Sequence, residues 1–115
     1  MIQFAIIHAA SGAIVMMTMS ADVALPAHLE RRPVPAGVDP GLHWWNGWSF
    51  APREDAAIDA VVAGEQVTVA CPDDAWLAFA DGTIAMDRSI ATPVRRARVM
   101  LVGRYRGDCW IEVQA

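Results

Sequence analysis

The chain has 115 residues, of which 55% are hydrophobic and 19% are charged, and its formal net charge is −4. This size fits one domain, or two small β modules that share a core, and the apolar content argues against a disordered chain. The acidic balance lacks the basic patch that nucleic-acid-binding modules normally carry, so we expect no nucleic-acid partner.

The strongly apolar segment from Ile2 to Met19 is predicted to form a β-hairpin. A signal peptide would begin with a positively charged region, yet no Lys or Arg occurs before Arg31. A membrane-spanning helix needs about 20 predominantly apolar residues, and polar residues interrupt this run. We therefore expect strands at Gln3–Ala9 and Ala13–Met19, joined by residues 10–12, and no membrane insertion.

The next segment, Leu25–Gly41, is predicted to be a connector. Within it, Ala27–Arg32 is long enough for one helical turn. Prolines are too frequent here for a helix interior or a central strand, and they stand at positions 26, 33, 35 and 40.

An Asn46-Gly47 pair lies among aromatic residues and predicts a hairpin, because both central residues of a type I′ turn need positive φ. A two-residue turn pairs Trp45 with Trp48, Trp44 with Ser49 and His43 with Phe50. One face then carries His43, Trp45, Trp48 and Phe50, and the other carries Leu42, Trp44, Ser49 and Ala51. Opposed aromatic residues stabilise a hairpin by about 0.2–1 kcal/mol per pair. The aromatic residues form either a core plug between the two halves of the chain or an exposed surface for a partner subunit or a sugar.

This hairpin carries a resemblance to the small tail proteins of tailed bacteriophages. The matching residues are Val38-Asp39-Pro40, then His43-Trp44-Trp45-Asn46-Gly47 and Pro52-Arg53, together with Ser11–Val15 near the start. The first half of the chain is similar in motif and the second half in layout only. The resemblance implies an N-terminal hairpin, a Pro/Gly linker, a Trp hairpin and a small β-sandwich. It also implies a virion component of the tail or its fibre apparatus, without catalytic residues.

Two segments follow the Trp hairpin. Pro52–Ala63 is predicted to be a short helix or a linker that enters a strand. Gln66–Cys71 alternates apolar and polar residues, which predicts a strand with Val67, Val69 and Cys71 directed inward.

A second hairpin is predicted at Asp81-Gly82. A two-residue turn pairs Phe79 with Ile84 and Leu77 with Met86, which places these four large apolar residues on one buried face.

A third hairpin is predicted at Arg106-Gly107, with Tyr105 paired with Asp108. Gly103 then lies across from Trp110, where a glycine would admit the indole. The predicted faces are Met100, Val102, Cys109, Ile111 and Val113 on one side and Val99, Leu101, Gly103, Trp110 and Glu112 on the other. The second face is too apolar to remain in water, so the N-terminal module or a neighbouring subunit should cover it.

The elements together predict an all-β protein built mainly of antiparallel hairpins. Residues 1–53 form a small N-terminal β-hairpin module with a Pro-rich linker and the Trp hairpin. Residues 54–115 form a small β-sandwich that is Ig-like in layout.

No constellation of residues indicates catalysis, a cofactor or a metal. His8, His28 and His43 lack the short spacing of zinc ligands, and the aspartates of the second half lack the oxygen spacing of a calcium loop. We expect an enzyme least of all classes, because no nucleophile and base can be nominated.

Two further features have simple interpretations. Cys71 and Cys109 are expected to be small core residues, with a disulfide between them as the alternative if their strands are neighbours. The cluster Arg95-Arg96-Ala97-Arg98 is expected to be a solvated sheet edge, with an inter-subunit salt-bridge patch as the alternative.

Two function classes remain. The first is a structural component of a phage tail, made in the host cytoplasm and present in many copies beside other tail proteins. The second is a β module that binds a host surface glycan or receptor through its tryptophans. The candidate partner or ligand interface consists of Trp44, Trp45, Trp48, Phe50 and Trp110. The discriminating feature is whether the indoles are buried in protein or open in a concave site.

Overall fold

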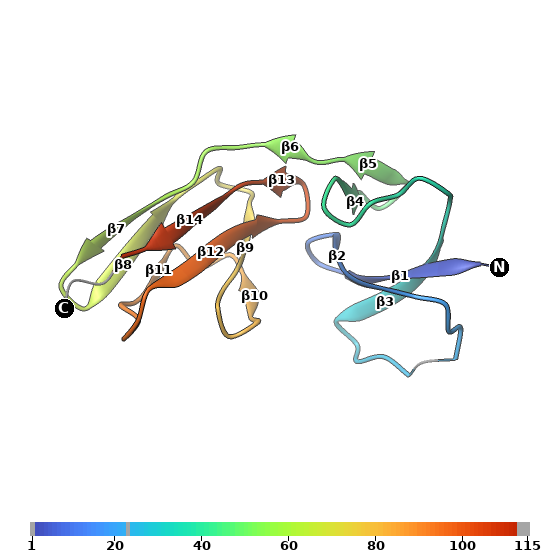
Figure 1. Ribbon diagram of the computed structural model, residues 1–115, viewed down its shortest axis with the longest axis horizontal. Coiled ribbons are helices and arrows are strands. Elements are labelled where there is room, and N and C mark those ends of the chain that lie inside the picture. The colour runs from blue at the N-terminus through green and yellow to red at the C-terminus, as the bar shows by residue number, and fades with distance from the viewer. Residues whose placement is uncertain (1, 23, 113–115) are drawn as a thin grey trace.

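The computed structural model is all-β and mainly antiparallel, as the sequence predicts. It describes residues 2–22 and 24–112 and has principal extents of 50 × 27 × 20 Å. Figure 1 shows the N-terminal sheet at one end of the long axis and the larger set of strands at the other. Within the described residues, no helix is long and apolar enough to cross a membrane.

The N-terminal sheet has three strands in the order β2-β1-β3, where β1 is Gln3–His8, β2 is Ala13–Thr18 and β3 is Leu29–Val34. The predicted first hairpin is therefore confirmed. Ala5, Ile6 and Ile7 of the central strand β1 are buried. Since successive side chains of a strand point to opposite faces, both faces of the sheet are covered at this point. The pairing of β1 with β2 contains an irregularity between Ile6 and Ile7.

The helical turn predicted at Ala27–Arg32 is wrong. Ala27 and His28 form a turn, and β3 begins at Leu29. Pro33 is compatible with this strand because β3 lies at the edge of its sheet, where one side of the backbone needs no ladder partner.

The Trp hairpin consists of β4 (His43–Trp45) and β5 (Phe50–Pro52). Its predicted register is wrong by two residues, since Trp45 pairs with Phe50, Trp44 with Ala51 and His43 with Pro52. Asn46 does not adopt a positive φ, as a type I′ turn would require; of the turn pair, only Gly47 does so, at +98°. The loop therefore has four residues, and a shift of two leaves Trp45 and Phe50 on the same face, as predicted.

The chain then passes through short strands into a β-sandwich (Figure 1). The strand β6 (Glu54–Asp55) pairs in parallel with β13 (Tyr105–Arg106). One sandwich sheet has the order β10-β9-β12-β14, and the other has the order β11-β8-β7. Their strands are β7 (Asp59–Ala63), β8 (Gln66–Ala70), β9 (Trp76–Ala78), β10 (Ile84–Ala85), β11 (Ser89–Ala91), β12 (Ala97–Val102) and β14 (Asp108–Ile111). Of the two possibilities for Pro52–Ala63, the linker that enters a strand is confirmed.

The sandwich core is built from residues of both sheets. It contains Val67, Val69, Ala75, Leu77, Val99, Leu101 and Ile111. The inward direction predicted for Val67 and Val69 is confirmed, and Cys71 packs against the same cluster. Cys71 and Cys109 are both free thiols at the margin of this core, and burial raises the pKa of each above its ordinary value.

The second hairpin forms with a register one residue away from the prediction. Leu77 pairs with Ala85, and Ala78 pairs with Ile84. The loop has three residues, because Phe79 N–H donates to the Thr83 carbonyl at 2.9 Å and Gly82 takes a φ of +88°. A shift of one residue reverses the faces of a strand. Ile84 therefore lies on the face opposite Leu77 and Phe79, and Met86 is 42% exposed.

The third hairpin turns at Gly103, not at the predicted Arg106-Gly107. Arg98 pairs with Trp110, Val99 with Cys109, and Met100 with Asp108. Gly103 has a φ of +74°, whereas Gly107 lacks a positive φ and lies close to the carbonyl of Ala56. The true register places Val99, Leu101 and Ile111 inward and Arg98, Met100, Asp108 and Trp110 outward. The outer face is thus more polar than predicted, and Val113 lies outside the described residues.

Candidate interaction site

The loop of the Trp hairpin is held by its own asparagine. The Oδ1 atom of Asn46 accepts hydrogen bonds from the backbone N–H groups of Trp48 and Ser49, each at 2.9 Å. This is an Asx turn, which satisfies two loop donors without a partner from elsewhere in the fold. Below the loop, the rings of Trp45 and Phe50 pack with their centroids 5.0 Å apart. The hairpin tip therefore has a defined conformation.

The base of the hairpin is attached to the N-terminal sheet. Trp45 N–H donates to the carbonyl of Gly12 at 2.9 Å, and the guanidinium of Arg32 lies 4.4 Å from the centroid of the Trp45 ring. Gly12 has a φ of +76°, and a Cβ at this position would overlap the backbone of Trp45 and the ring of Trp44. Glycine is thus needed both for its conformation and for the close approach of the hairpin.

Arg53, directly after the hairpin, joins the N-terminal part to the sandwich. Its Nε donates to the carbonyl of Gly103 at 2.9 Å, and its Nη2 donates to those of Leu101 at 2.9 Å and Tyr105 at 2.6 Å. Its Nη1 donates to the carbonyl of Gly41 at 3.1 Å. Burial, and to a smaller extent the charge of Arg106, lowers the pKa of Arg53 from its ordinary value. The planar guanidinium suits this role because its donors are held in a fixed fork.

Two further contacts define a seam between the parts. Gly103 lies so close to the carbonyl of Ser11 that a Cβ would overlap it. The ring of His8 packs edge-on to that of Trp76, with 5.4 Å between the centroids. Ser11 itself is buried, and its Oγ lies 2.7 Å from Nδ1 of His8.

Two hollows near this seam share Trp44 as a lining residue. One, of about 280 Å³, lies between the N-terminal sheet and the Trp hairpin and is lined by Trp44 and Trp45 and by polar residues that include Glu30, Arg32 and Asn46. The other, of about 170 Å³, is lined by Trp76, Asp74, Arg104 and Tyr105. Ala10, Ser11 and Trp44 line both hollows.

The predicted interface residues divide into three settings. Trp44, Trp45 and Phe50 are half-buried in the hairpin. Trp48 stands at the tip with 91% of its surface exposed. Trp110 lies apart from them on β14, 46% exposed, with the guanidinium of Arg96 4.1 Å from the centroid of its ring. The structure therefore brings four of the five residues onto one hairpin.

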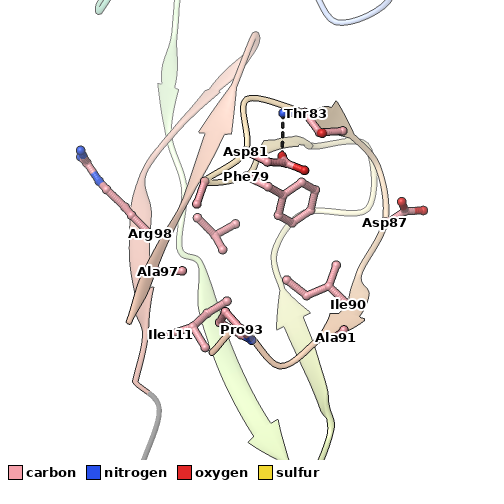
Figure 2. Close-up of a pocket in the computed structure, with 12 residues that line it drawn as sticks. Phe79, Asp81, Thr83, Asp87, Ile90, Ala91, Pro93, Ala97, Arg98 and Ile111 are labelled. Carbon is pink, nitrogen blue, oxygen red and sulfur yellow. Dashed lines mark hydrogen bonds between the residues drawn. The ribbon is translucent and has the colours of Figure 1, made fainter. Parts of the chain in front are cut away.

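A larger cavity, which the sequence did not indicate, opens between the sandwich sheets. It has a volume of about 340 Å³, and Figure 2 shows Phe79 and Ile90 pointing into it, while Arg98 and Asp87 extend away from it. Asp81, at the rim, accepts a hydrogen bond from the Thr83 backbone N–H at 2.9 Å. The register predicted for the second hairpin placed Phe79 in a closed core with Ile84, so the sequence did not predict this cavity.

The three histidines weighed as zinc ligands, and two arginines of the basic cluster, make contacts within the fold. His8 and His28 are neighbours, with ring centroids 6.3 Å apart. The Nδ1 atom of His43 accepts a hydrogen bond from the backbone N–H of Asp39. In the part of the chain that the structure describes, no group of three or more His, Cys, Asp or Glu residues could hold a metal ion. Arg96 pairs with Glu112 and Arg98 with Asp108 on the outer face of the sheet. The cluster does not mark a sheet edge as predicted, because β12, which carries Arg98, lies between β9 and β14.

Comparison with protein-family models, with curated proteins and with solved structures gave no match.

Proposed function

We propose that the chain is a non-enzymatic structural protein of a bacteriophage tail, in the tip or fibre region, that docks onto neighbouring virion subunits. The observation that carries the proposal is the setting of Trp48. This large aromatic side chain is 91% exposed at the tip of a hairpin, where nothing in the fold requires an indole. Tryptophan is enriched among the few residues that dominate the binding energy of protein interfaces.

The rigidity of the hairpin supports this role. The Asx turn of Asn46 fixes the loop, and Arg53 fixes the end of the hairpin to the sandwich. A side chain presented on an already ordered element loses less entropy on binding, so more of its contact energy remains as affinity. The resemblance to phage tail proteins includes both the Asn46-Gly47 turn and Pro52-Arg53, and in this fold those residues build and anchor the hairpin.

The exposed apolar residues elsewhere agree with a protein that has several neighbours. Val15, Met16 and Met19 belong to the N-terminal part, and Val61 lies in the sandwich, all of them exposed. Assembled tail subunits would cover such residues, as interfaces commonly do.

The test is incorporation into particles. Trp48→Ala should leave the melting temperature of the isolated protein almost unchanged, since the side chain is exposed, but should reduce the amount found in purified particles by immunoblotting. Val94→Ala is the matched control, because Val94 is 93% exposed away from the hairpin. Wild-type protein that is absent from purified particles, or Trp48→Ala that enters them at the wild-type level, would overturn the proposal.

A glycan-binding role is the second candidate, and one observation favours it. Trp44, unlike Trp48, lines concave hollows together with polar side chains.

A further inference from the structure

The surroundings of Trp44 have the composition of a ligand site. Trp44 lines both hollows, so a ligand long enough to pass from one to the other would remain in contact with this residue. Binding sites for small ligands usually combine an aromatic or apolar surface with a few polar groups that fix orientation. They also occur preferentially at junctions between structural units. The first hollow lies between the N-terminal sheet and the Trp hairpin, and the second lies where the N-terminal part meets the sandwich.

The polar side chains of the first hollow include donors, in Arg32 and Asn46, and an acceptor, the carboxylate of Glu30. Arg32 Nη2 contacts Glu30 at 3.4 Å, and Arg32 Nε is buried without a hydrogen-bond partner among the described residues. Asn46 uses Oδ1 for the loop, so its side-chain N–H groups are its remaining donors.

The second hollow carries a similar set. The hydroxyl of Tyr105 donates to Asp74 Oδ1 at 2.8 Å, and Arg104 Nη1 contacts Asp74 Oδ2 at 3.1 Å. Arg104 also contacts Glu54 through Nε at 2.6 Å. All of these groups are at the protein surface, where a ligand could share their hydrogen bonds.

The charges at the site indicate which ligands it would accept. Arg32 faces Glu30 in one hollow, and Arg104 faces Asp74 in the other. Each hollow therefore has its charges paired, and the chain as a whole has a net charge of −4. An anionic polymer would gain little attraction here and would be repelled at long range. A neutral ligand rich in hydroxyl groups could instead donate to the carboxylates and accept from the guanidinium and amide N–H groups.

The seam is also held in place without a ligand. Arg53 bonds to three carbonyls of the sandwich, and Gly103 packs directly against Ser11, which lies between the hollows. A preformed site avoids much of the ordering cost of binding.

We propose that the groove formed by these two hollows, centred on Trp44, binds a short neutral oligosaccharide. A pyranose ring would place its C–H face against the indole, and its hydroxyl groups would reach Glu30, Arg32 and Asn46 on one side and Asp74, Arg104 and Tyr105 on the other. This inference develops the second candidate function and does not depend on the structural role of Trp48.

The experiment begins with an array of immobilised neutral oligosaccharides and a parallel set of sialylated and sulfated ones. The neutral oligosaccharide with the strongest signal is then titrated calorimetrically against the wild type, Tyr105→Phe and Asp74→Asn. Hydrogen bonds to charged groups are among the stronger ones in proteins, so Asp74→Asn should weaken binding about tenfold or more. Tyr105→Phe should weaken it by a smaller factor, because it removes one hydroxyl.

Trp44→Phe tests the aromatic wall and should also weaken binding. If this variant fails to fold, the Asp74 and Tyr105 variants still decide the question, since both residues contribute exposed polar groups. Trp48→Ala and Trp110→Phe are the controls, because neither residue lines the groove, and both variants should bind as the wild type does.

Three results would each overturn the inference: no neutral oligosaccharide bound at millimolar concentration, binding of anionic glycans alone, or binding unchanged by the Asp74 and Tyr105 variants. The two proposals also fail separately. Loss of particle incorporation in Trp48→Ala concerns the docking role, whereas loss of sugar binding in Asp74→Asn concerns the groove.

Discussion

Arg53 and Leu101, 48 residues apart in the chain, are joined by a hydrogen bond of 2.9 Å from the guanidinium Nη2 to the backbone carbonyl. The same Nη2 bonds to the carbonyl of Tyr105, and Nε bonds to that of Gly103. One side chain thus satisfies three carbonyls around the turn of the third hairpin. These carbonyls would otherwise have few partners where the two parts of the molecule meet.

Replacing Arg53 with Met should destabilise the protein by about 2–3 kcal/mol, because it keeps the apolar stem and leaves carbonyl groups without their donors. Chemical denaturation would measure this loss. Arg53→Lys should recover only part of it, since an ammonium cannot reproduce the fork. Arg95→Ala, at an exposed arginine, should change the stability by less than about 0.5 kcal/mol. An equal effect of the Arg53 and Arg95 variants would contradict the anchoring role.

Gly103→Ala should be considerably more destabilising than Gly37→Ala. Both glycines have positive φ, +74° and +92°, so both substitutions incur the left-handed conformational cost of about 1–2 kcal/mol. Gly37 has open space around its Cα, whereas a Cβ at Gly103 would overlap the carbonyl of Ser11. The difference between the two variants in thermal melting therefore isolates the close contact at the seam. Similar losses for the two would show that the contact is unimportant.

Trp110→Ala should cost about 1–2 kcal/mol, not the 3–5 kcal/mol expected for a fully buried aromatic residue. The indole is 46% exposed and its main neighbour on the outer face is Arg96, an exposed cation–π contact worth about 0.5–1 kcal/mol. Urea denaturation of Trp110→Ala and of Trp110→Phe would measure the two contributions. A loss above about 3 kcal/mol would mean that the residue is buried by something else, such as another subunit.

Stability should decrease as the pH falls below neutrality, and His8 should contribute to this. Burial, followed by the charge of His28, lowers the pKa of His8 below its ordinary value of 6.5. Its Nδ1 accepts a hydrogen bond from Ser11 N–H at 3.3 Å, which protonation would remove. Because the folded-state pKa is the lower one, the stabilisation is complete above pH 6.5 and is lost as the pH falls through the folded-state pKa. Melting temperatures between pH 7.5 and 5 should therefore fall less steeply in His8→Gln than in the wild type. Identical slopes would exclude His8 as a contributor.

Removal of metal ions should leave folding unchanged. The sandwich core contains enough buried apolar residues to fold without one. Thermal melting before and after treatment with a chelator is the measurement. A large fall in melting temperature after chelation would contradict this prediction.

The local pattern of the sequence was sufficient for the fold class and for several elements. Alternation of Val67 and Val69 with polar neighbours predicted β8, and the uncharged apolar run around Ser11-Gly12 predicted the first hairpin. These features depend on neighbours in the sequence, so periodicity and turn residues are informative about them. The presence of the Trp hairpin was likewise predictable from Asn46-Gly47.

Registers were determined by the tertiary structure. Two-residue turns predicted for Asn46-Gly47 and Asp81-Gly82 were replaced by longer loops, in which only the glycine takes a positive φ. The turn assigned to Arg106-Gly107 lies at Gly103, because Gly107 is needed where the chain passes Ala56. A register depends on which longer-range contacts are satisfied, and a change of one residue exchanges the two faces of a strand.

For the candidate sites, too, the sequence predicted some features and the tertiary structure determined the others. The sequence identified Trp44 and Trp48 by residue type, but their different settings depend on the folded chain: Trp48 is exposed at a tip and Trp44 lines two hollows. Nothing in the sequence indicated that Asp74, Arg104 and Tyr105 would line a hollow with Trp44, because they become neighbours of Trp44 only when the sandwich packs against the N-terminal part. The sequence by itself thus determined an all-β chain with an aromatic hairpin, since short-range patterning specifies strands and turns. Only the tertiary structure decided the registers, the Arg53 anchor and the two hollows at Trp44, since each depends on contacts between residues far apart in the chain.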